Sequence, residues 1–401
     1  MWTLGIDVAK FRHCATLLDE AGRPVFTNLS VEHSRQGVEA LVLRLAACGP
    51  APAGIRVGME ATGHYWMILF EALSQAGYQA ELINPLVTAA RRNVTIRGSK
   101  TDSTDATLIA RLLRETDLKV CAVPQGPPRQ LRDLTRLRFE CAHQAVGDKR
   151  RLLGLLDLAF PEYHEHFSDV TGVTSRAVLE AFPTAEELAQ VDIRRLTRLL
   201  LEASRGRFGR TQAQRLKAAA KNSFALIHGH EALALEIRFV IERVNLLLEQ
   251  IAQLDQRIRT LLTDQQQLLQ SIPGLGEIWT PTVLAEVLPV FDPEAPHGAK
   301  KLVATAGIDV RLNDSGEKTG TGKMSKRGSR YLRTAVMEAA QVAVFRAHDP
   351  LFESVYQRQR DRGKHHLVAL SHTANKMLHV VFSVLKTNRP YTPQLPTAVT
   401  P

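Results

Sequence analysis

Short apolar runs and longer helical patterns alternate along the first 125 residues of the chain. The runs are bounded by turn-forming residues such as Gly22 and Pro24, which is typical of β-strands. Strands are predicted at residues 2–9, 12–19, 23–31, 55–60 and 79–84. Helices are predicted at 35–47, at 65–76 and from residue 102 onward. This mixed order predicts an α/β domain that ends near residue 125, at a Pro- and Gly-containing segment.

The clearest periodicity lies at residues 233–261, where apolar residues step by four and three positions in turn. This spacing indicates a heptad seam over about four heptads. Its partner is either an Arg-rich helix predicted at 129–158 or a second copy of the protein. We expect a helical hairpin that also contributes to dimerisation. The seam consists of Leu233, Ile237, Val240, Val244, Leu247, Ile251, Leu254, Ile258 and Leu261.

Helical patterns also fill the C-terminal part of the chain. Helices are predicted at about 329–346, 350–361 and 364–387. Residues 161–230 carry little information, and His164 and His166 fit a surface turn better than a metal site because no third ligand is near. The expected parts are the α/β domain at 1–125, a helical coiled-coil region at 126–264, a small, mostly helical domain at 265–390 and a disordered, Pro- and Thr-rich tail at 391–401.

The net charge of +10 is unevenly distributed along the chain. Residues 1–84 carry 6 Lys and Arg against 8 Asp and Glu, whereas the remainder carries 45 against 33. This excess predicts a nucleic-acid partner whose phosphates are held mainly outside the first strands. A merely soluble basic protein is the alternative.

Several classes of protein are disfavoured. No apolar run reaches the roughly 18 residues of a membrane span, and the N-terminus lacks the charged and apolar regions of a signal peptide. The four cysteines show no C-x-x-C spacing, which argues against a zinc site and a disulfide framework. We therefore expect a cytoplasmic protein that does not interact with membranes.

Two pairs of acids are candidates for chemistry. Asp102 and Asp105 are three residues apart in the first turn of a predicted helix, so their side chains share one helix face. Neighbouring carboxylates repel each other unless a cation lies between them, although a solvated helix start is the alternative. Asp7 and Glu60 end two predicted buried strands, where an acid needs a partner or a metal. The four acids together suit one or two Mg²⁺ ions and phosphoryl transfer.

Three motifs carry a family resemblance. They are Gly-Ile-Asp-Val-Ala-Lys at 5–10, Met-Glu-Ala-Thr-Gly-His-Tyr at 59–65 and Lys-Thr-Asp-x-x-Asp-Ala at 100–106. In order and spacing they resemble the DEDD transposase domain of the insertion sequence 110 family, which is itself similar to the RuvC-like junction resolvases of the RNase H superfamily. The resemblance implies an RNase H-like fold for residues 1–125. It also implies that the catalytic, metal-binding quartet is Asp7, Glu60, Asp102 and Asp105.

A basic segment precedes the acidic pair. It contains Arg91, Arg92, Arg97 and Lys100 and enters beside the expected metal site. These cations contact phosphates near the scissile bond or serve as counter-charge for the carboxylates, and the two roles are compatible.

A second candidate centre lies at residues 302–333. A Walker P-loop is excluded, because Met324 follows Lys323 and Glu317 stands where the first glycine is needed. The segment resembles the C-terminal transposase domain of the same family, which implies that Ser315 is the nucleophile. Spacing alone would suit Ser325 or Ser329 equally well. The expected nucleic-acid contacts here are Lys323, Lys326, Arg327, Arg330 and Arg333.

The resemblance implies a site-specific DNA recombinase of a mobile element. It implies Mg²⁺ dependence, a covalent phosphoserine intermediate and donor and target DNA chosen by a structured non-coding guide, the bridge RNA. It also implies homodimers that pair into a tetramer, in which one protomer's DEDD domain joins another's serine domain. A metal-dependent junction nuclease, a DNA invertase and a non-enzymatic nucleic-acid-binding protein are the alternatives.

Overall fold

The computed structural model describes two compact units, Met1–Pro124 and Gln125–Pro401. The described residues are 1–92, 102–115, 118, 120–121, 123–261, 264–311 and 323–393. Within these ranges, no helix combines the length and the apolar character needed to cross a membrane.

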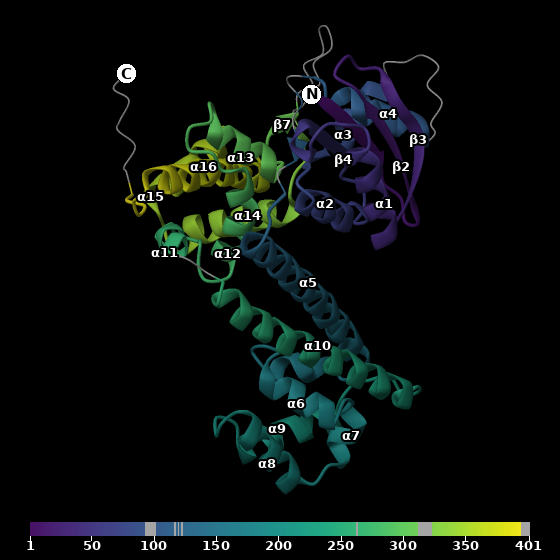
Figure 1. Ribbon diagram of the computed structural model, residues 1–401. Coiled ribbons are helices and arrows are strands. Elements are labelled where there is room, and N and C mark those ends of the chain that lie inside the picture. The colour runs from purple at the N-terminus through teal and green to yellow at the C-terminus, as the bar shows by residue number, and fades with distance from the viewer. Residues whose placement is uncertain are drawn as a thin grey trace, which may run out of the picture. The chain divides into compact units, whose positions relative to one another are not determined.

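The first unit is a mixed α/β domain around one sheet (Figure 1). Its strands follow the order β3-β2-β1-β4-β5-β6, with β1, β4 and β5 parallel and the other pairings antiparallel. The strands are β1 (Trp2–Asp7), β2 (Arg12–Leu18), β3 (Pro24–Glu32), β4 (Ile55–Glu60), β5 (Gln79–Ile83) and β6 (Val120–Cys121). The helices are α1 (Arg35–Ala46), η1 (Pro52–Gly54), α2 (Trp66–Gln75), α3 (Pro85–Arg92) and α4 (Asp102–Leu112).

Side chains alternate between the two faces of the sheet along each strand, and α1 and α2 cover one face while α4 covers the other. Leu4 and Ile6 point into a core shared with α1 and α2. Gly5 points the other way, where an added Cβ would lie 2.1 Å from the carbonyl oxygen of Ala106 in α4. A side chain at Gly5 would therefore push α4 off the sheet. Asp7 lies two residues beyond Gly5, so it shares the face that α4 covers.

Three short elements of this unit were missing from the prediction. They are η1, the two-residue strand β6 and α3, whose last residues Arg91 and Arg92 were predicted only as the start of a basic segment. Asn84 explains the helix: its side-chain oxygen accepts a 2.9 Å hydrogen bond from the N–H of Leu86, and Pro85 occupies the first helical position. The Asn-Pro pair both stops β5 and starts α3.

The second unit is almost wholly helical. Its N-terminal part comprises α5 (Pro127–Ala159), η2 (Pro161–His166), α6 (Val173–Ala181), α7 (Ala185–Gln190), α8 (Ile193–Ala203), α9 (Arg210–Lys221) and α10 (His230–Arg259). Its C-terminal part comprises α11 (Asp264–Gln270), α12 (Trp279–Val287), η3 (Leu288–Val290), α13 (Gly298–Ala306), β7 (Val310–Arg311), β8 (Lys323–Met324), α14 (Arg330–Phe345), α15 (Pro350–Asp361) and α16 (His366–Thr387).

The heptad seam on α10 packs within the chain. Helices α5 and α10 contact each other along their length (Figure 1). Leu247 of α10 packs with Cys141 of α5, and Ile258 of α10 packs with Leu131 of α5. Val244 belongs to the core that α10 shares with helices α6–α9. Ion pairs reinforce the two long helices, with Arg138 bound to Asp255 at 2.5 Å and Arg243 to Asp148 at 2.7 Å. Partners within the chain therefore pack against the seam, and its contribution to dimerisation stays a prediction.

The ordered chain continues past residue 390, where the sequence predicted a disordered tail. The Tyr391 hydroxyl donates to the Asp349 carboxylate at 3.1 Å, and its ring stacks on Phe352. The Tyr391 N–H donates to Ser271 Oγ at 2.7 Å. These bonds attach the start of the expected tail to α15 and α11. Residues 394–401 lie outside the described part of the chain.

Candidate active site

The four acids of the expected quartet come from elements that meet at one edge of the sheet. Asp7 ends β1 and Glu60 ends β4, and these strands are parallel neighbours, so their carboxyl ends share an edge. Asp102 and Asp105 occupy the first turn of α4, which packs on the same face of the sheet. The fold thus brings together residues that are up to 98 positions apart in the sequence.

Electrostatics show that the four carboxyl groups interact. The pKa of Asp7 is raised to about 6, first by burial and then by the negative charges of Asp105, Asp102 and Glu60. Burial and the charges of Asp7 and Asp102 likewise raise the pKa of Cys14, which pairs with Asp7 across the strands. Such a concentration of negative charge is typical of a site for a cation or for catalysis.

Hydrogen bonds orient two members of the quartet. The Glu60 carboxylate accepts from the Thr62 hydroxyl at 2.7 Å and from the Thr88 hydroxyl at 2.8 Å. Arg92 lies 3.0 Å from Asp105 through its guanidinium group. Thr62 and Thr88 could not be selected from the sequence, because a threonine near a strand end carries no distinguishing signal.

The chemistry of this site fits a divalent cation. Carboxylate oxygens are the ligands that Mg²⁺ prefers, and the negative charges of Asp105, Asp102 and Glu60 act on Asp7 in addition to its burial. Among the described residues, however, no three His, Cys, Asp or Glu side chains are arranged closely enough to enclose an ion. The acids are therefore gathered without forming a complete coordination shell.

The basic segment contributes counter-charge. Arg91 pairs with Glu115 at 2.5 Å and Arg92 with Asp105 at 3.0 Å, both within the first unit. The Arg92 pair agrees with the counter-charge interpretation, whereas Arg91 pairs with an acid outside the quartet, and phosphate contact stays a prediction for both. Arg97 and Lys100 lie outside the described residues.

The second candidate centre is described only at its borders. Ser315 lies within residues 312–322, outside the described ranges. The Ser325 hydroxyl donates to the Asp309 carboxylate at 2.5 Å, and the Ser329 hydroxyl caps α14 by accepting from the N–H of Leu332 at 3.2 Å. The hydroxyl groups of both alternatives to Ser315 are therefore engaged in hydrogen bonds within the fold.

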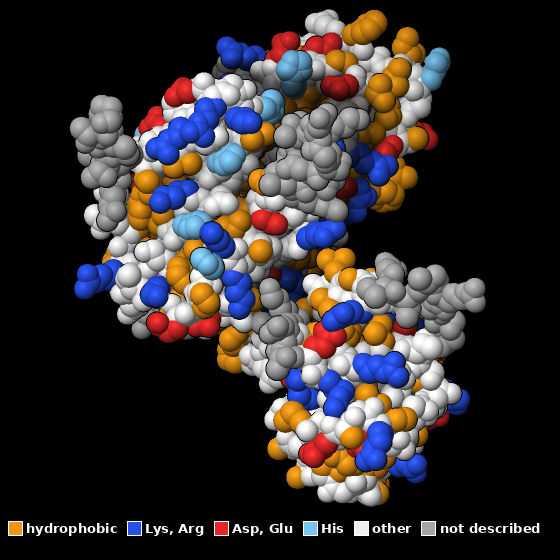
Figure 2. Space-filling view, turned by 90° about the horizontal axis from the view of Figure 1, so that it is seen from above, with side chains coloured by type: hydrophobic (Ala, Val, Ile, Leu, Met, Phe, Trp, Pro, Cys, Tyr) orange, Lys and Arg blue, Asp and Glu red, His pale blue; other side chains and the backbone are white. Residues whose placement is uncertain are grey.

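The five predicted nucleic-acid contacts near this centre divide into two groups. Lys323, Lys326 and Arg327 are exposed. By contrast, Arg330 pairs with Glu140 and its guanidinium lies 5.0 Å from the Tyr331 ring centre, while Arg333 donates to a carbonyl at the end of α13. Figure 2 shows Lys and Arg side chains spread over the face that it draws, with Asp and Glu among them. Only the first group is fully available to a phosphate backbone.

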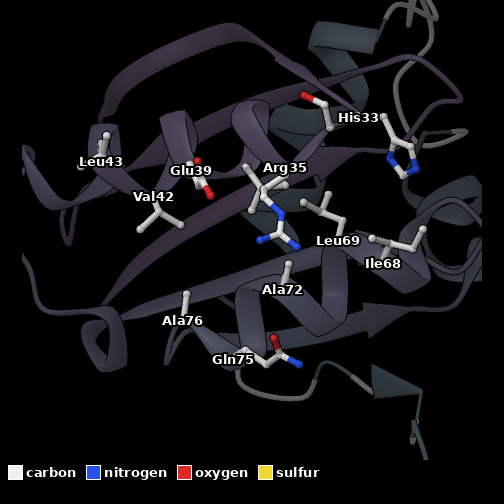
Figure 3. A pocket seen from close by; sticks show the side chains of 12 residues that line it. His33, Arg35, Glu39, Val42, Leu43, Ile68, Leu69, Ala72, Gln75 and Ala76 are labelled. Carbon is white, nitrogen blue, oxygen red and sulfur yellow. The ribbon is translucent and has the colours of Figure 1, made fainter.

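A cavity of about 890 Å³ lies between α1 and α2 (Figure 3). Its lining includes the exposed side chains of Leu43 and Ile68. Because α1 and α2 cover the face of the sheet opposite α4, this cavity is separate from the carboxylates. It does not belong to the candidate active site.

Comparisons with known proteins agree along the whole chain. Residues 4–161 match a family model of the DEDD transposase of IS110 elements, described as a transposase, and residues 266–357 match the model described as transposase IS116/IS110/IS902 family. An uncharacterized 44.8 kDa protein of insertion element IS116 from Streptomyces clavuligerus is 26% identical, over 99% of this chain and 98% of its own length. The mini-circle putative transposase for IS117 of Streptomyces coelicolor is 26% identical, over 97% and 95%. The pilin gene-inverting protein of Moraxella bovis is 23% identical, over 97% of both chains.

Proposed function

This chain is a transposase of the IS116/IS110/IS902 family, an enzyme of DNA recombination, and we propose that it cleaves and exchanges DNA strands at its four-carboxylate edge with Mg²⁺ as the cation. The observation that carries this proposal is the placement of the four acids: Asp7 and Glu60 end the parallel neighbours β1 and β4, and Asp102 and Asp105 begin α4, which packs on the same sheet. Burial and the charges of the other three acids raise the pKa of Asp7, which agrees with this placement. Asp7, Glu60, Asp102 and Asp105 would hold the ion. When bound, Mg²⁺ supplies positive charge to the phosphate oxygens of the DNA.

The protein's own residues then have defined tasks. The hydroxyl groups of Thr62 and Thr88 each donate a hydrogen bond to the Glu60 carboxylate and so hold it in one orientation. Arg92 balances the buried Asp105 until another cation or a DNA phosphate enters. The exposed Lys323, Lys326 and Arg327 contact the phosphate backbone.

We further propose that Ser315 is the nucleophile, as the sequence resemblance implies. Its Oγ forms a bond to the phosphorus of a DNA phosphodiester, and the bond from phosphorus to one DNA oxygen breaks. The serine proton passes to a base, and the departing oxygen becomes a free DNA hydroxyl by taking up a proton. Attack by the hydroxyl of another strand reverses these changes and restores Ser315, so no outside energy source is needed. On the same resemblance, one protomer of a tetramer supplies Ser315 to the carboxylates of another, and a bridge RNA selects donor and target DNA.

The quartet is tested by replacing single acids. Glu60→Gln and Asp102→Asn should abolish strand joining in Mg²⁺ while leaving DNA binding in a gel-shift assay largely intact. Glu39→Gln is the matched control, because Glu39 is exposed on α1, on the opposite side of the sheet, and should keep full activity. Full joining by either quartet variant would exclude that acid from the chemistry.

DNA inversion is the second candidate, favoured by the similarity to the pilin gene-inverting protein. Both reactions break and rejoin strands, so the active site does not distinguish them. A plasmid that carries the gene with its natural flanking DNA distinguishes them by product. Transposition places the element at a new site, whereas inversion reverses a segment in place.

A further inference from the structure

An exposed phenyl ring stands at the same edge of the sheet as the four carboxylates. Phe11 belongs to the short connection between β1, which ends at Asp7, and β2, which starts at Arg12. The ring is 73% exposed. Among the described residues it makes no contact with another aromatic ring, so the core does not account for it.

A chain of hydrogen bonds fixes the backbone of this connection. The Ala9 N–H donates to Nδ1 of His13 at 3.2 Å, so the proton of neutral His13 is on Nε2. That Nε2–H donates to Nδ1 of His33 at 2.9 Å. The backbone N–H of His33 in turn donates to the carbonyl oxygen of Phe11 at 2.9 Å. His13 and His33 thus bind the backbone at Ala9 and at Phe11, which fixes the backbone that carries the Phe11 ring.

Cations lie next to the ring in the chain. The Lys10 ammonium lies 4.9 Å from the ring centre, and the Arg12 side chain, 70% exposed, lies 3.6 Å from the exposed Glu32 carboxylate. An exposed aromatic ring with a cation near its face and a second cation next to it in the chain matches a nucleotide, whose base stacks on the ring while its phosphates meet the charges. A protein partner is the alternative, because Phe and Arg are enriched at protein–protein interfaces although lysine is depleted there, and the experiment below distinguishes the two.

We propose that Phe11 is a stacking platform for an unstacked DNA base next to the phosphodiester that is cut. This inference rests on the proposed function, because the position of Phe11 beside Asp7 matters only if the carboxylates are where DNA is cut. Lys10 and Arg12 contact the phosphates on either side of that base. Phe11 is thus a substrate-positioning residue that acts at the base rather than at the scissile bond.

The proposal is tested with the DNA that the wild-type protein cleaves, carrying 2-aminopurine at one of the bases flanking the cut. Stacking on an aromatic ring quenches 2-aminopurine fluorescence. Wild type should quench it, whereas Phe11→Ala should abolish the quenching and weaken binding of this DNA by about tenfold. Phe11→Trp should retain both properties, and Phe11→Leu should behave like Phe11→Ala because it is apolar but has no ring.

Phe224→Ala is the matched control, since Phe224 is 90% exposed in the second unit and should leave both signals unchanged. Normal quenching and binding by Phe11→Ala or Phe11→Leu would overturn the proposal. A loss of self-association in Phe11→Ala on sedimentation, with DNA signals intact, would instead identify a protein contact. Asp7→Asn separates the stacking proposal from the proposed function. This variant should bind the DNA and quench its fluorescence without cutting it. If it cuts the DNA normally, the proposed function itself fails.

Discussion

Arg92, the last residue of α3, lies 3.0 Å from Asp105 in the first turn of α4. Asp105 is the one buried member of the quartet, with 8% of its surface exposed. The positive charge of Arg92 also opposes the rise in the pKa of Asp7. The charge of Arg92 therefore reduces the repulsion among the four acids. A cation that binds to these acids would take over part of that task.

Replacing Arg92 should make the fold depend more on Mg²⁺. In EDTA, Arg92→Gln should lower the free energy of unfolding by about 1 kcal/mol, because Asp105 loses its neighbouring charge. Added Mg²⁺ should then raise the melting temperature more in this variant than in wild type. Arg91→Gln is the control, since its pair with Glu115 is half exposed. An equal response to Mg²⁺ in Arg92→Gln and wild type would contradict this view.

The buried His13 should make the first unit sensitive to acid. Burial and the neighbouring His33 lower the pKa of His13 from 6.5 to about 4. Between these values the unfolded chain binds a proton that the folded one does not, so stability is complete above pH 6.5 and falls as the pH drops toward 4. The contribution of His13 to this loss should be on the order of 2–3 kcal/mol. The raised pKa of Asp7 acts in the opposite direction and offsets part of it in the wild type, so the comparison with a His13 variant is the measurement.

Urea unfolding at pH 7 and pH 4.5, followed by a signal of the first unit, measures this loss. His13→Gln should show a smaller difference between the two conditions. The exposed His64 in the same unit is the control, and His64→Gln should keep the wild-type difference. If His13→Gln retains the full loss, the acid sensitivity arises elsewhere.

Three serines near the second centre should respond differently to replacement by alanine. Ser315→Ala should eliminate the protein–DNA adduct on a denaturing gel. Ser325→Ala and Ser329→Ala should keep it, because their hydroxyls bond Asp309 and cap α14. Loss of the cap in Ser329→Ala should still cost about 1 kcal/mol of stability. An adduct that persists in Ser315→Ala would mean that another residue is the nucleophile.

Charge introduced into the heptad seam should unfold the second unit rather than dissociate an oligomer. Val244 is fully buried, so Val244→Asp should cost several kcal/mol, on the order of 3–5, and reduce the helical circular dichroism. Leu246→Asp is the control, because Leu246 is 53% exposed on the same helix and should change stability by about 0.5 kcal/mol or less. A folded Val244→Asp variant with a lower mass on sedimentation would show that the seam joins separate chains.

Local patterns in the sequence determined most of the elements. The short apolar runs and the helical spacings predicted β1, β4, α4 and α10 to within a few residues of their observed bounds, because each pattern records which residues of its own element face a core. The same spacing, with the family motifs, selected Asp7, Glu60, Asp102 and Asp105. The identity of this chain as a transposase could therefore be inferred from sequence, and the comparisons confirmed it.

Only the tertiary structure decided which groups serve as partners. Nothing in the sequence indicates that Thr88 bonds Glu60 or that α5 and the α6–α9 core, rather than a second copy, cover the seam of α10. A periodic pattern shows that a face is buried but not what buries it, because that choice depends on contacts between residues far apart in the chain. The pairing of Arg92 with Asp105 arises in this way, when α3 and α4 pack together on the folded sheet.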